Sequence, residues 1–114
     1  MCIRDSGKGG FRFAGMSHRG SLLCLPDGIW PWPVTQPSDI TEAALEPVFA
    51  RGEDIDLFLI GAGRGGWILP KPLRERFKAL SISVEVTNTG RAISTYNILL
   101  GEGRRVAAGL IADE

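Results

Sequence analysis

Residues 55–60 read IDLFLI, which is the strongest indication of the fold in this sequence. A short, nearly continuous apolar run that is bounded by turn residues is typical of a strand buried on both faces, as in a parallel sheet covered by helices. Gly52 precedes the run, and a glycine-rich segment, residues 61–66, follows it. We therefore expect residues 55–60 to lie in the middle of a sheet that is sandwiched between helices.

Predicted helices and strands alternate on both sides of this run. Upstream, Ser38 or Thr41 can cap a helix that extends to about Arg51, in which apolar residues recur at helical spacing. Such alternation argues for a mixed, largely parallel sheet with helices on both faces. Downstream, the pattern predicts a helix, a strand, a second helix and a last strand, over residues 72–80, 82–86, 88–102 and 105–111.

The N-terminal part of the domain is predicted to be β-rich. Residues 10–29 divide into two or three short strands, FRFAG, HRGSLLCL and the start of GIWPW. The turn at Pro26-Asp27-Gly28 marks one boundary, because proline presets one corner of a turn and glycine accepts a positive φ. Residues 30–33, which read WPWP, are expected to form an extended connector or an edge, since prolines donate no hydrogen bond within a sheet.

The chain has 114 residues, a length that fits a single domain. Residues 1–6, MCIRDS, fit neither strand nor helix periodicity and look like translated adaptor sequence. We therefore expect a non-native leader over residues 1–6, which we leave out of the fold, and one domain over residues 7–114. Under this interpretation Cys2 has no structural meaning.

Composition argues against several classes of protein. Thirteen basic residues balance thirteen acidic ones, so the chain lacks the positive field on which nucleic-acid binding relies. No apolar stretch approaches the ~20 residues that span a membrane. Cys2 and Cys24 are too few for a disulfide framework or a zinc site. We expect a soluble, cytoplasmic protein that needs no metal or cofactor and binds no nucleic acid.

Three blocks of sequence resemble a known family. They are GGFRFAGMSHRGSLLCLP at residues 9–26, DLFLIGAGRGG at residues 56–66 and TGRAISTYNILLGEGRRVAAGLI at residues 89–111. In this order they resemble the domain-of-unknown-function 498 family, and the resemblance implies a three-layer α/β domain of the MTH-938-like fold. The family includes the mitochondrial assembly factor 3 of respiratory complex I and many bacterial and archaeal members with no assigned activity. It therefore suggests a protein partner.

The glycine-rich segment could form a ligand site. Gly61, Gly63 and Gly66 have the G-x-G-x-x-G spacing of dinucleotide-binding loops, but prolines at positions 70 and 72 follow before a helix can begin. A milder hypothesis is an anion pocket beyond the carboxyl ends of the strands. Its candidate residues are Gly63, Arg64, Gly65, Asn88, Thr89, Arg91, Tyr96 and Asn97. The alternative, which we favour, is that the glycines permit turns, the arginines are solvated or paired, and the last two residues lock a helix to its sheet.

The sequence offers no recognisable combination of residues for catalysis. His18 is the single histidine, and no Asp, Ser or Cys follows or precedes it at a sequence spacing known from catalytic sites. Cys24 lies between Leu23 and Leu25 in an apolar run, which indicates a buried thiol rather than a nucleophile. We therefore assign no catalytic residue.

Two segments rich in tryptophan and proline are candidates for binding a partner. Trp30, Trp32 and Trp67 combine large apolar rings with rigid backbone, and tryptophan is over-represented among the residues that dominate interface energy. The alternative, to which we give equal weight, is that these rings fill the ends of the domain.

Two hypotheses of function follow. The favoured one is a non-catalytic, assembly-factor-like module that holds a protein partner, as part of building a respiratory or other membrane-associated complex. The other is an enzyme or binding domain that holds a small anionic ligand through residues 61–66. Whether the chain forms a homo-oligomer is left open.

Overall fold

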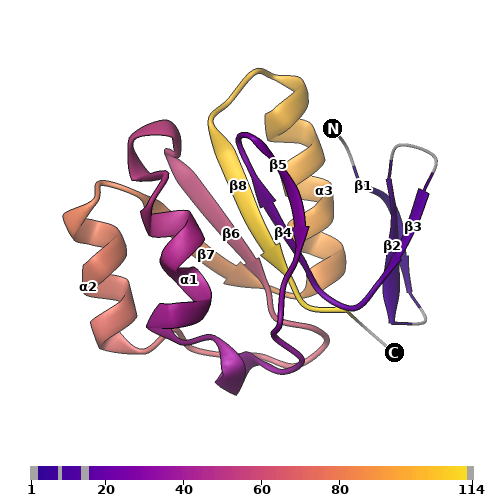
Figure 1. The fold of residues 1–114 in the computed structure, drawn as a ribbon, viewed down its shortest axis with the longest axis horizontal. Coiled ribbons are helices and arrows are strands. Elements are labelled where there is room, and N and C mark those ends of the chain that lie inside the picture. Colours follow the sequence, from indigo (N-terminus) through magenta and orange to yellow (C-terminus); the bar gives the residue numbers. More distant parts are fainter. Residues whose placement is uncertain (1–2, 8, 14–15, 113–114) are drawn as a thin grey trace.

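The computed structural model describes residues 3–7, 9–13 and 16–112. The main sheet is formed by β4 (Leu22–Leu25), β5 (Gly28–Pro31), β6 (Leu57–Gly61), β7 (Ser83–Thr87) and β8 (Val106–Leu110). Its order is β5-β4-β8-β6-β7, and Figure 1 shows helices on both sides of it. The sheet is mixed, because β4 runs antiparallel to β5 and β8, whereas β6 runs parallel to β7 and β8.

Strand β6 lies inside the sheet, between β8 and β7. Phe58 and Ile60 point into the core on one face, and Leu59 points into the core on the other. Burial on both faces explains why this strand is apolar without alternation. The prediction for residues 55–60 is confirmed, although the strand itself begins at Leu57 and Ile55 is buried just before it.

The helices form the outer layers of the domain. Helices α1 (Glu42–Phe49) and α2 (Lys71–Ala79) cover one face of the main sheet, and α3 (Thr89–Gly101) covers the other. Thr41 caps α1, as one of the two predicted caps, because its side chain accepts a hydrogen bond from a backbone N–H of the first turn. The α/β class, the mixed sheet and the helices on both faces agree with the sequence-based expectation.

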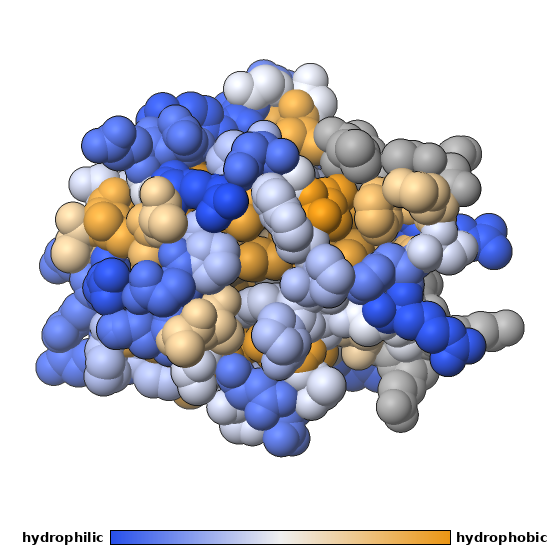
Figure 2. Space-filling view, viewed as in Figure 1, coloured by the Kyte–Doolittle hydropathy of each residue, from blue (hydrophilic) through white to orange (hydrophobic). Residues whose placement is uncertain are grey.

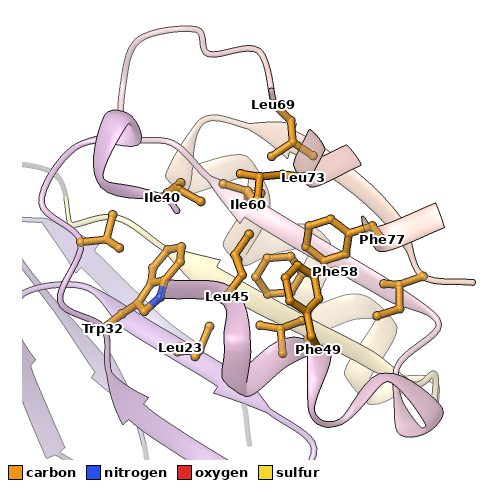
Figure 3. Packing of buried hydrophobic residues seen from close by; sticks show 14 of the residues in the cluster. Leu23, Trp32, Ile40, Leu45, Phe49, Phe58, Ile60, Leu69, Leu73 and Phe77 are labelled. Atoms are coloured by element: carbon orange, nitrogen blue, oxygen red, sulfur yellow. The ribbon is translucent and has the colours of Figure 1, made fainter. Parts of the chain in front are cut away.

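Aromatic rings from α1, α2 and β6 meet in the larger core, which Figure 3 shows from close by. The ring of Phe77 packs against two others, with its centroid 5.0 Å from that of Phe49 and 5.5 Å from that of Phe58. Phe58 and Phe77 are fully buried. This cluster joins both helices of the face to the central strand.

A second, antiparallel sheet is formed by β1 (Ile3–Gly7), β2 (Gly10–Phe13) and β3 (Met16–Arg19). It lies beside α3, at the right of Figure 1. The predicted strand HRGSLLCL is divided between the two sheets, because the chain bends at Gly20, whose φ is +86°. The N-terminal part is β-rich, as expected.

Residues 3–6, which we left out of the fold, belong to β1, whereas the assignment of residues 1–6 as a non-native leader stays a prediction. Ile3 is only 1% exposed and packs into the core beneath α3. The side-chain amide of Asn97 holds the Ile3 backbone, accepting a hydrogen bond from its N–H at 2.8 Å and donating one to its carbonyl at 2.6 Å. The prediction about Cys2 lies outside the described residues.

Candidate functional site

The parallel strands β6 and β7 end on the same side of the main sheet, and Thr89 joins three segments there. Thr89 is fully buried at the start of α3. Its hydroxyl accepts a hydrogen bond from the Gly63 N–H at 2.9 Å and donates one to the Ile111 carbonyl at 2.7 Å. The Gly63 carbonyl accepts the N–H of Thr89 at 3.0 Å. The loop after β6, the helix and the end of β8 are therefore tied together at this point.

A cavity of about 260 Å³ opens between this loop and the end of β7. Of the predicted ligand-binding residues, its lining contains Arg64, Gly65 and Asn88. Two of the backbone donors that an anion would need are already used: the N–H of Gly63 by Thr89, and the N–H of Arg91 by the Asn88 side chain at 2.8 Å. Arg91 is exposed and does not line the cavity. The site is therefore a turn held by hydrogen bonds, with one arginine, Arg64, lining the cavity beside it.

Tyr96 and Asn97 lie farther along α3 and do not line this cavity. Tyr96 is 3% exposed and packs in the core between α3 and the sheet, where it forms a hydrogen bond with Cys24. Asn97 holds β1, as described above. In this structure both residues fix neighbouring elements, which is the alternative that the sequence left open.

The three tryptophans occupy different environments. Trp32 is 4% exposed, and its indole N–H donates a hydrogen bond to the Ala44 carbonyl of α1 at 3.0 Å. It fills the core, where a partner cannot reach it. Trp30 is 40% exposed on the edge strand β5, and Trp67 is partly buried. Of the predicted partner-binding residues, Trp30 and Trp67 are the two that present surface.

Trp30 borders an apolar groove of about 550 Å³ between α1 and the hairpin of β4 and β5. Figure 2 shows hydrophobic residues exposed across the middle of the molecule, with hydrophilic residues above and below them. Arg51 stands at the rim, with its guanidinium carbon 5.2 Å from the Trp30 ring centroid and its Nε 2.6 Å from Asp27 Oδ1. That hydrogen bond lowers the pKa of the Asp27 carboxyl below its ordinary value. The indole thus lies at the mouth of the groove in contact with an arginine that is itself paired with Asp27.

Sequence reasoning missed the α1 side of this groove. Besides Glu46, the wall consists of small and cyclic residues whose helical spacing carries no functional signal, namely Ala43, Ala44, Pro47 and Ala50. The exposed Pro47 within the helix was the one available hint, because a proline inside a helix leaves a surface that does not continue regularly.

The two residues that the sequence offered for catalysis, His18 and Cys24, lie in different sheets. His18 is half-buried on β3, and Cys24 is fully buried on β4. Within the described residues, no three His, Cys, Asp or Glu side chains gather as metal ligands, and each buried side-chain nitrogen or oxygen has a hydrogen-bond partner. Burial raises the pKa of the Cys24 thiol to about 12, outweighing the lowering effect of its hydrogen bond with Tyr96.

Cys24 is expected to be inert towards thiol reagents while the domain is folded. The reactive thiolate is negligibly populated at pH 8 when the pKa is near 12. In the Cys2→Ser protein, Ellman's reagent should release almost no colour in buffer and one equivalent in denaturant. Rapid reaction of the native variant would contradict the buried position.

None of the helices in the described part of the chain combines the length and apolar character needed to span a bilayer.

The family described as "Protein of unknown function (DUF498/DUF598)" matches residues 3–111. An uncharacterized protein of Rhodobacter capsulatus is 42% identical over 96% of this chain and 82% of its own length. The zebrafish (Danio rerio) NADH dehydrogenase [ubiquinone] 1 alpha subcomplex assembly factor 3 is 33% identical over 90% of this chain. The chain spans only 59% of that relative.

Solved structures are also similar to this chain in sequence and fold. A crystal structure described as an outer membrane protein from Bartonella henselae is 43% identical, with a TM-score of 0.94 over 98% of this chain and 94% of that one. The solution structure of a Mth938-like domain from Bordetella pertussis is 25% identical, with a TM-score of 0.85 over 97% of this chain and 85% of that one. The MTH-938-like fold expected from the sequence is confirmed.

Proposed function

The chain belongs to the DUF498/DUF598 family, and on that premise we propose that it is a non-catalytic assembly factor that holds a protein subunit while a respiratory membrane complex is built. The observation that carries the proposal is the alignment of 90% of the chain with an assembly factor for NADH dehydrogenase. We place this work in the cytoplasm, at the surface of the membrane complex. The subunit, rather than a small substrate, is the ligand.

The groove beside Trp30 supports such a role. An exposed indole at the mouth of an apolar groove is the kind of residue that contributes most to binding energy when a partner covers it. The contact with Arg51 restricts the ring, so that less side-chain entropy is lost on binding. The groove is therefore the first surface to alter in a test of partner binding.

Deletion of the gene in the native host is expected to reduce the amount of fully assembled NADH dehydrogenase in the membrane and to leave partial complexes. Native gel electrophoresis with in-gel activity staining measures both. The wild-type gene should restore assembly, and Trp30→Ala should restore it poorly. Ile98→Ala is the matched control, because Ile98 is 62% exposed on α3, away from the groove. Normal assembly in the deletion strain would refute the proposal.

The alternative function is binding of a small anionic ligand, and the position of Arg64 and Asn88 on the cavity beside the glycine loop favours it. A thermal-shift screen with nucleotides and phosphorylated metabolites tests it. Under this alternative one class of anion raises the melting temperature of the wild type, and Arg64→Ala abolishes the rise. No stabilisation by any member of the screen would remove the alternative.

A further inference from the structure

Strand β7 is an edge of the main sheet, since it pairs with β6 and with no other described strand. The Ser83 N–H donates to the Asp56 carbonyl, and the Thr87 carbonyl accepts from the Ala62 N–H. The backbone groups of residues 83, 85 and 87 therefore face β6. Because the direction alternates along a strand, the N–H and C=O groups of the intervening Val84 and Val86 face outward, to the open edge.

A groove follows this open edge. Two adjoining cavities of about 260 and 290 Å³ share Trp67 and Val86 in their linings. Ile68, Leu69 and Val84 complete the apolar part of the second cavity, and Ile68 is 81% exposed. An open backbone edge beside pockets for alternate side chains is the arrangement by which a sheet accepts an additional strand. An exposed edge of this kind is otherwise a liability that proteins cover or block.

The charged side chains that line the groove have one sign. The charged side chains in its lining are those of Arg64 and Arg74, and no acidic side chain lines it. Arg74 donates a hydrogen bond to the Leu69 carbonyl at 2.8 Å, which fixes it on the groove wall while leaving its positive charge in place. The other face of β7 presents Glu85, which is exposed. The edge thus offers a basic, apolar face on one side and an acidic position on the other.

A second copy of this chain fits the edge poorly. Glu85 is the middle residue of β7, so antiparallel pairing of two copies in register would place one Glu85 directly opposite the other. Like charges directly opposite each other destabilise a sheet. The second copy would also bring its own arginines to a groove that is already basic.

We infer that the edge of β7 receives an extended segment of the partner protein as a sixth strand of the main sheet. The segment turns apolar residues and one acidic residue toward Arg74 and the groove, and a basic residue toward Glu85. This inference rests on the proposed function, because it names the surface and the chemistry by which the partner subunit is held. Under this inference, the groove beside Trp30 binds a different part of the same partner.

A synthetic peptide tests the edge without the native partner. The probe carries the core Asp-Thr-Val-Lys-Val-Thr between Gly-Ser flanks, so that Asp and both Val residues share one face. In ¹⁵N NMR titrations with the full chain, we expect the amide signals of Val84 and Val86 to shift most. Val86→Pro should abolish binding, because it removes an outward N–H without removing a bond to β6. Shifts confined to other regions would overturn the inference.

Charge reversal on an exposed side chain provides a second test that leaves the strand intact. Arg74→Glu should weaken binding of the peptide roughly five- to tenfold, and a peptide with Lys in place of Asp should bind this variant better than the wild type. Lys78→Glu is the matched control, because Lys78 lies on the same helix outside the groove. Equal affinities for all three proteins would contradict the assigned chemistry.

The host assay separates failure of this inference from failure of the proposed function. If Val86→Pro and Arg74→Glu both restore complex assembly as well as the wild type, the edge inference fails and the proposed function stands. If the deletion has no effect on assembly, the proposed function fails whatever the peptide does. Sedimentation of a wild-type dimer that Val86→Pro converts to a monomer would show that a second copy occupies the edge, and would overturn the inference.

Discussion

Replacing Phe58 with alanine is expected to lower the free energy of unfolding by about 3 to 5 kcal/mol. The side chain is fully buried on the inner strand β6, and its ring stacks on that of Phe77 with 5.5 Å between centroids. Removal leaves a cavity in the layer between the sheet and its two covering helices, which are held by the sheet and cannot collapse freely. Urea unfolding followed by tryptophan fluorescence measures the loss, with an unchanged slope.

Two controls make this result specific to the core. Phe58→Leu keeps most of the apolar volume and should cost less than about 1.5 kcal/mol. Ile98→Ala, on the exposed side of α3, should change stability by no more than about 0.5 kcal/mol. A loss below about 1 kcal/mol for Phe58→Ala would contradict the inner position of β6.

Thr89→Val is expected to cost about 2 to 4 kcal/mol, although valine has nearly the same shape as threonine. The change removes a hydroxyl that is fully buried and leaves the Gly63 N–H and the Ile111 carbonyl without their partner. A buried polar group that loses its partner costs about 1 to 3 kcal/mol, so the buried Ile111 carbonyl contributes most of the loss and the partly buried Gly63 N–H contributes less. The melting temperature should fall, and the Gly63 amide should exchange with solvent faster than in the wild type.

Thr89→Ser is the matched control for this prediction. Serine keeps the hydroxyl that joins the loop to the end of β8 and loses a single methyl group, worth about 1 kcal/mol. If the serine and valine variants lose the same stability, the hydrogen bonds of Thr89 do not hold the loop in place. The loop that lines the cavity would then be held by other contacts.

The sequence predicted the elements that depend on local signals, such as a strand buried on both faces, a helix cap or a turn. Residues 55–60 could be recognised because both faces of β6 are covered, which leaves an apolar run that few other structures explain. The cap at Thr41 and the turn at Gly28 were predictable for local reasons, since the residue type itself sets the backbone geometry. These features need no knowledge of distant parts of the chain.

Features that depend on distant residues could not be predicted. Trp32 is buried because Gly109 leaves room for it: a Cβ at Gly109 would lie 2.7 Å from two atoms of the indole ring. Nothing near Trp32 or Trp30 in the sequence indicates which of the two rings meets that glycine. Residues 3–6 were misjudged for a similar reason, because the amide that holds Ile3 comes from Asn97, near the other end of the chain.

The candidate site shows the same division. That the loop after β6 and the start of α3 share one edge could be predicted, because parallel strands end on the same side. Which strand lies at the border of the sheet could not be predicted, because the apolar pattern of β7 does not reveal the order of the strands. The groove residues Ile68 and Arg74 therefore carried no functional signal until the fold placed them beside Val84 and Val86.

Affinity purification of the tagged chain from its native host, with quantitative mass spectrometry against an untagged strain, tests the proposed assembly role most directly. The role predicts strong enrichment of a subunit of the respiratory NADH dehydrogenase. Loss of that enrichment in the Trp30→Ala protein is expected if the groove beside Trp30 binds the subunit, and loss in the Val86→Pro protein is expected if the edge of β7 does. Recovery of no enriched subunit, from cells in which the complex is being made, would contradict it.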